Sequence, residues 1–118
     1  MPRFQIFSGF TLVGYSDLEL GDAPMGVAAG EFLPTDAYLA IQPAVIAART
    51  GSQMHLSLTA RSATGLVLPA QGGVHILDYS SELGTTGLEV SVMGIGYPLY
   101  EDLFPEHVAA YRSQWGSS

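Results

Sequence analysis

The sequence predicts an α+β fold: a mostly antiparallel sheet of about six strands, flat or curled, with two helices packed on it. Three observations lead to this prediction. The chain has 118 residues, a length typical of one hydrophobic core. Several stretches alternate apolar and polar residues as strands do. Two others space their apolar residues as helices do. We expect a single domain over residues 1–115 and a frayed tail over residues 116–118.

The N-terminal residues predict a hairpin. Two runs rich in aromatic and β-branched residues, 4–7 and 10–15, flank a Ser-Gly pair that tolerates the positive φ of a tight turn. The second run is expected to continue as a strand to Leu20, because Leu18 and Leu20 alternate with acidic residues.

The next stretch predicts a slim strand followed by helix. Residues 26–32 are apolar but consist largely of glycine and alanine, and a strand this small lets another group approach closely. Apolar residues then recur at helical spacing from Tyr38 to Val45, and Gly51 supplies a stop. Pro43 removes an N–H from this stretch, so we expect a kink there or two short helices meeting at Gln42.

The second half of the chain predicts further antiparallel strands and a final helix. Residues 53–61 alternate cleanly, with Met54 and Leu56 on one face and His55 on the other. Phe104 and Val108 lie at helical spacing, and Pro105 suits a first helical turn. The expected strands are 53–61, 66–68, 74–79 and 88–92, with a polar loop over 80–87 and a helix over 105–115.

The charge balance excludes some partners and favours others. Eleven acids face four arginines and no lysine, which gives a formal net charge of -7. Four scattered cations cannot follow a phosphate backbone, so the sequence disfavours nucleic acids and anionic membranes. A basic protein partner fits the charge, because acidic surfaces steer cationic ones.

Low charge content also indicates self-association. Charged residues form only 13% of the chain, so some apolar surface is expected to remain exposed on a monomer, and such patches mark interfaces. We expect a homo-oligomer, with a dimer favoured. Aromatic residues gather near the C-terminus and serve either the core or such an interface. The candidate interface residues are Tyr97, Tyr100, Tyr111 and Trp115.

Cysteine usage and the N-terminus say little about compartment. There is no cysteine, which removes disulfides, thiol nucleophiles and thiolate metal sites from consideration. The first residues lack the apolar run of a signal peptide, and no stretch approaches the roughly 20 apolar residues of a membrane span. A cytoplasmic location is therefore the default expectation.

Three acids flank a glycine-rich turn and form the candidate site: Glu19, Asp22 and Glu31. Loop carboxylates can hold a hard cation or act as an acid and base pair. Calcium loops, however, place oxygen ligands at close regular spacing, whereas this stretch has alanine, proline and methionine at those positions. We therefore expect no metal and no cofactor, and a structured turn with solvated acids is the simpler interpretation.

The histidines and serines form no local catalytic pattern. His75 and Asp78 are three apart in a predicted strand and so point to opposite faces, while His55 and His107 stand alone. No nucleophile elbow or dinucleotide fingerprint occurs.

Two functions remain open. The first is a non-catalytic, acidic protein-interaction module that self-associates or binds a protein partner, with a basic protein as one option, as immunity-type inhibitors do. The second is a small enzyme or ligand-binding protein whose pocket is lined by Asp22, Glu31 and one histidine. No motif in the chain identifies a family of known function.

Overall fold

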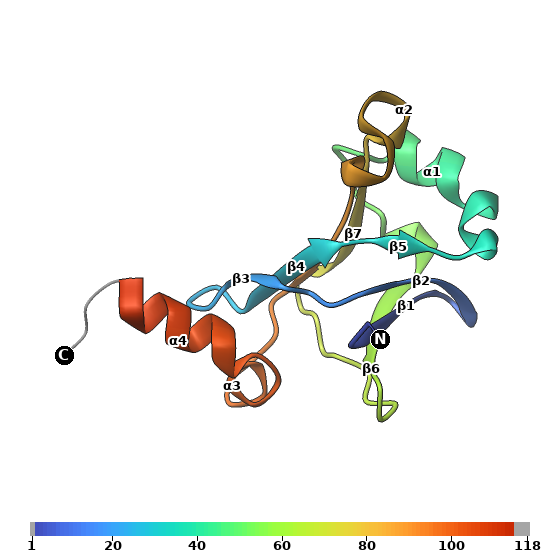
Figure 1. Ribbon diagram of the computed structural model, residues 1–118. Coiled ribbons are helices and arrows are strands. Elements are labelled where there is room, and N and C mark those ends of the chain that lie inside the picture. The colour runs from blue at the N-terminus through green and yellow to red at the C-terminus, as the bar shows by residue number, and fades with distance from the viewer. Residues whose placement is uncertain (1, 115–118) are drawn as a thin grey trace.

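Two four-stranded antiparallel sheets form the centre of the structure, a computed structural model that describes residues 2–114 (Figure 1). The strand order is β5-β2-β1-β6 in the first sheet and β3-β4-β8-β7 in the second. The strands are β1 Phe4–Ser8, β2 Thr11–Ser16, β3 Leu20–Asp22, β4 Val27–Glu31, β5 Leu33–Pro34, β6 Leu58–Ser62, β7 Gly73–Asp78 and β8 Leu88–Met93.

The predicted α+β class is confirmed, but the strands form two sheets rather than one of about six strands. The predicted strand from residue 10 to Leu20 breaks at Leu18, which takes a left-handed φ of 47° and buries its side chain. The Leu18 N–H donates to the Ser16 hydroxyl at 3.0 Å, and the chain then enters the second sheet as β3. It returns to the first sheet after Phe32, between β4 and β5.

Helices lie at both ends of the molecule, with α1 and α2 at one end and α3 and α4 at the other (Figure 1). The prediction of two short helices meeting at Gln42 is confirmed, because Pro43 sits in the first turn of α1. The final helix is also confirmed as far as the description reaches, and the predicted loop over 80–87 is helical instead. The helical segments are the 3₁₀ helices η1 Asp36–Ala40, η2 Met54–Leu56 and η3 Gly84–Gly87, and the α-helices α1 Gln42–Ala47, α2 Ser80–Leu83, α3 Leu99–Leu103 and α4 Pro105–Gln114.

The predicted strand over 53–61 is correct only in its second half. Residues 54–56 form η2 and Ser57 takes a φ of 51°, so Met54 is exposed although Leu56 is buried. The cause lies in Gln53, which is buried and pairs its side-chain amide with both main-chain groups of Ile76, at 2.9 and 2.8 Å. A side chain therefore covers this part of the β7 edge, where a strand was expected.

The predicted strand over 66–68 is reduced to one isolated bridge between Arg61 and Val67.

Both sheets contribute to one apolar core. Ile6 and Ala60 of the first sheet and Ile76 and Val90 of the second are fully buried within it.

Contacts from Arg3 and Phe4, at the start of β1, hold α3 and α4 against the first sheet. Arg3 forms an ion pair with Glu106 at 2.7 Å and also donates to the Leu103 carbonyl, while its guanidinium lies 5.3 Å from the centre of the Phe104 ring. The Phe4 and Phe104 rings pack 5.4 Å apart beneath it. Burial opposes ionisation of Glu106, but the hydrogen bonds from Arg3 and from the main chain, together with the positive charge of Arg3, outweigh burial and hold the pKa of this carboxyl below its ordinary value.

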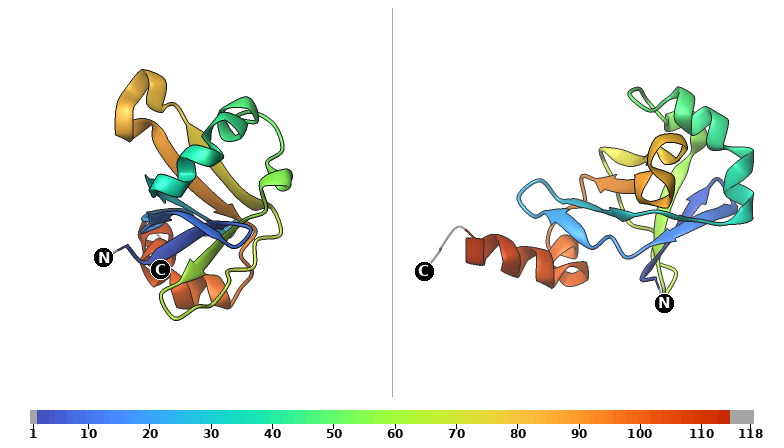
Figure 2. Two further views of the ribbon diagram at one scale, coloured as in Figure 1. Left: turned by 90° about the vertical axis from the view of Figure 1, so that its right-hand side faces the viewer. Right: turned by 45° about the horizontal axis from the view of Figure 1, so that its top comes forward.

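The molecule is elongated, with principal extents of 48 × 30 × 28 Å. In Figures 1 and 2, the β3–β4 turn and α4 project together from the rest of the chain. We call β3, the turn at residues 23–26, the start of β4, and α4 the arm.

Candidate functional site: a groove in the arm

The arm depends on a glycine. A Cβ atom at Gly21 would lie 2.5 Å from His107 Cδ2 and 2.5 Å from the Tyr100 hydroxyl oxygen. Only a residue without a side chain lets α4 approach β3 this closely. The alternation of the strand then directs Leu20 and Asp22 to the face away from α4.

A groove of about 510 Å³ runs between β3 and α4. Its first wall is the continuous stretch 19–23. Its second wall is one stripe of α4 at positions i, i+3, i+4 and i+7, namely His107, Ala110, Tyr111 and Gln114. The described part of α4 beyond Val108 is exposed, so the groove opens to solvent along most of its length.

The groove also borders a free strand edge. Among the described strands, β3 stands at the end of its sheet and pairs only with β4. An end strand of an antiparallel sheet directs the N–H and C=O groups of alternate residues outward, where they are available to another chain.

The aromatic residues proposed as an interface divide into two kinds. Tyr100 is fully buried and donates to the Val27 carbonyl at 2.8 Å, so it belongs to the core. Tyr97 and Tyr111 are 50% and 41% exposed, although the Tyr97 hydroxyl donates to the Ala23 carbonyl at 2.7 Å. Trp115 lies outside the described residues.

Tyr97 and Tyr111 line a second hollow, which borders the groove and shares Ala23 and Tyr111 with it. Its volume is about 390 Å³, and its lining is Ala23, Pro24, Tyr97, Val108, Tyr111 and Arg112. Burial raises the pKa of the Tyr97 hydroxyl above its ordinary value, and the nearby Glu101 carboxylate raises it further, so the phenol stays a neutral donor at neutral pH.

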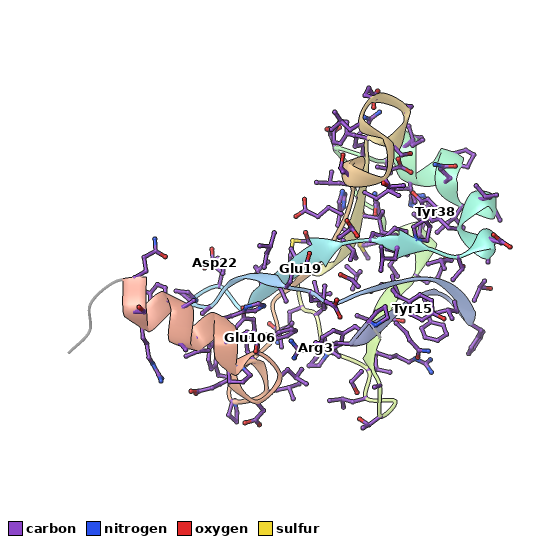
Figure 3. All side chains as sticks on the ribbon, in the orientation of Figure 1. Arg3, Tyr15, Glu19, Asp22, Tyr38 and Glu106 are labelled. Atoms are coloured by element: carbon purple, nitrogen blue, oxygen red, sulfur yellow. The ribbon has the colours of Figure 1, made fainter. Side chains whose placement is uncertain are left out.

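Of the three candidate acids, Glu19 has a structural role. Its Oε2 accepts the Glu31 N–H at 3.0 Å, and its carboxylate lies against Gly30, where a Cβ would come within 2.3 Å of Oε1. Glu19 precedes β3 in the chain, and its side chain binds the main chain of β4. Figure 3 labels Glu19 and Asp22 along this strand pair.

The three candidate acids do not share one hollow. Asp22 lines the groove together with Glu19, whereas Glu31 lines a separate hollow of about 300 Å³ and pairs across the sheet with Glu89. Within residues 2–114, no group of three or more histidines, cysteines or acids is placed to hold a metal ion.

His107 in α4 and His75 in β7 each donate a hydrogen bond to a main-chain carbonyl. His107 is buried, donates through Nε2 to the Leu18 carbonyl at 2.9 Å, and stacks on Phe104 with ring centres 4.9 Å apart. His75 donates through Nε2 to the Arg49 carbonyl at 3.0 Å. These contacts position the arm and the β7 edge.

A buried carboxylate that sequence reasoning missed lies at the opposite end of the molecule. Asp78 is 1% exposed and accepts hydrogen bonds from Tyr38 at 2.5 Å, from Gln42 at 3.0 Å, and from Ser80 N–H and hydroxyl at 2.9 and 2.6 Å. Burial alone would raise its pKa, but the bonds from Ser80, Tyr38 and Gln42 outweigh burial and lower it. Burial and Asp78 together raise the pKa of Tyr38. The network joins β7 to η1 and α1.

No protein-family model matches the chain, no curated protein matches it, and no solved structure matches it. Within residues 2–114, none of the helices combines the length and the apolar character that crossing a membrane requires.

Proposed function

We propose that this chain is a non-catalytic protein-interaction module of the cytoplasm, which self-associates as a dimer and binds a basic protein partner. The observation that carries the proposal is a group of exposed apolar and aromatic side chains on the arm and beside it. On the arm these are Leu20, Met25 and Tyr111, which are 58%, 68% and 41% exposed, and beside it Tyr97 is 50% exposed.

Two properties of the arm support this role. Aromatic side chains and methionine are enriched where proteins bind one another, because they bury much apolar area. The hollow shared by Tyr97 and Tyr111 gives such side chains a shallow recess, and the arm projects from the body as a separate contact surface (Figure 2). We assign dimerisation to this hollow.

Sedimentation equilibrium tests the proposal. The parent chain is expected to dimerise at micromolar concentration, and the double variant Met25→Ser/Tyr111→Ser is expected to weaken the dimer about tenfold or more, as loss of central interface residues does. The matched control is Phe10→Ser/Met54→Ser, which removes exposed apolar side chains elsewhere and should leave the dimer unchanged. A strictly monomeric parent that also captures no partner would contradict the proposal.

A further inference from the structure

We infer that the groove between β3 and α4 binds an extended, cationic segment of a partner protein, which pairs with β3 as an added strand. This inference rests on the proposed function and specifies the partner for one surface of it. The groove borders the Tyr97 hollow assigned to dimerisation and shares Ala23 and Tyr111 with it, but residues 19–22 line the groove alone.

The geometry of the groove fits an added strand. One wall consists of five consecutive residues, 19–23, and an extended segment of that length spans roughly 17 Å. A strand added beside β3 gains main-chain hydrogen bonds from the free edge. Its side chains then alternate between the α4 stripe, at Ala110 and Gln114, and the opposite face, beside Leu20 and Asp22.

The charge of the groove selects a cationic segment. Glu19 and Asp22 line it, and no arginine does. The ion pairs found among the described residues join Arg3 to Glu106, Arg49 to Glu82 and Arg112 to Glu101, all outside the groove. An arginine or lysine from a partner therefore meets the Asp22 carboxylate, which belongs to none of these pairs, while Glu19, whose carboxylate accepts the Glu31 N–H, adds negative charge nearby.

The same charges argue against a second copy of this chain in the groove. Pairing β3 with β3 of another copy brings the Glu19 and Asp22 carboxylates of both chains to one edge. Each chain also carries a formal net charge of -7. Like charges at a strand pairing destabilise it, so the edge resists its own copy and accepts a segment of opposite charge.

Nuclear magnetic resonance titration of the full chain with defined peptides tests the inference. The probe is an acetylated, amidated peptide of four Arg-Val repeats. One comparison peptide has four Glu-Val repeats, and another has four Arg-Pro repeats, which keeps the charge but removes alternate amide donors. We expect only the Arg-Val peptide to shift the amide signals of residues 19–23 and 107–114, with a dissociation constant of about 0.1–1 mM, as expected for a short strand-forming segment.

Matched variants locate the binding. Asp22→Asn should weaken Arg-Val binding several-fold and Asp22→Lys about tenfold or more, because attraction is first removed and then reversed. Asp36→Lys makes the same charge change at an exposed position in η1 and should leave binding unchanged. Unchanged spectra of the free variants show that each one folds.

Three results would overturn the inference: no shifts up to about 2 mM of the Arg-Val peptide, equal binding of the Arg-Pro peptide, or shifts confined to another surface. In the first case the groove carboxylates only protect a strand edge from pairing. None of these results touches the Met25 and Tyr111 measurement, so the interaction module can stand when the groove assignment fails.

Discussion

At the scale of single residues, the buried hydrogen-bond network of Asp78 is one that the sequence does not predict. Asp78 ends an apolar strand, and its alternation marks it for the buried face. Its partners Tyr38 and Gln42, however, come from helices about forty positions earlier. No local spacing encodes that meeting, since tertiary packing alone brings the three side chains together.

The Asp78 network predicts a specific dependence of stability on pH. Because folding lowers the pKa of Asp78, its contribution is full above the unfolded value of about 3.9 and is lost as pH falls through the folded value. We expect Asp78→Asn to reduce the free energy of unfolding by about 1–3 kcal/mol at neutral pH, because an amide places a donor where the network supplies donors.

Urea unfolding of parent and Asp78→Asn at successive pH values measures this contribution. The difference between the two proteins should stay constant from neutral pH down to about pH 5 and shrink below about pH 4. Glu106, whose pKa is also lowered, is present in both proteins and cancels. A difference that grows in acid would show that the network favours the protonated form.

At the scale of elements, composition predicted the slim strand and its close neighbour but not the identity of that neighbour. The small side chains of residues 26–32 predicted a strand that another group approaches closely, and β4 confirms this prediction. The approaching group at Gly30 is the carboxylate of Glu19, together with the Ser16 hydroxyl 2.9 Å from the position of a Cβ. The strand breaks at Leu18, and this break turns Glu19 toward β4. It depends on a left-handed φ, which a leucine rarely adopts and which the sequence therefore does not predict.

A double-mutant cycle tests this contact. Gly30→Ala should reduce the free energy of unfolding by about 1–3 kcal/mol, because its Cβ meets both Glu19 and Ser16. In a Glu19→Ala background the same change should cost about 1 kcal/mol less, since the nearest contact is gone.

Gly96→Ala is the control for this cycle, because a Cβ there has no neighbour within 4 Å. Its effect should stay within about 0.5 kcal/mol. An equal cost of Gly30→Ala in both backgrounds would place the conflict elsewhere, either at Ser16 or in the conformation of the strand.

At the scale of the whole molecule, the candidate site joins parts that are far apart in the chain. The groove needs residues 19–23 beside 107–114, and contacts such as His107 to Leu18, 89 positions apart, hold it together. Sequence identified several of its members separately, Glu19 and Asp22 as candidate acids and Tyr111 as a candidate aromatic. The sequence does not predict that these residues lie together. Their arrangement depends on the change of sheet at Leu18 and on the close approach of α4 at Gly21, where there is no side chain.

The net charge of -7 predicts opposite salt responses for the two proposed interactions. Two copies of an acidic chain repel, so raising ionic strength from about 0.02 M to about 0.3 M should strengthen the dimer by screening that repulsion. The same change should weaken the Arg-Val peptide, whose attraction to Asp22 and Glu19 is screened. Sedimentation and peptide titration across this range measure the two trends. A dimer that dissociates with salt would mean that charge pairing holds it, and the apolar Tyr97 hollow would lose its assigned role.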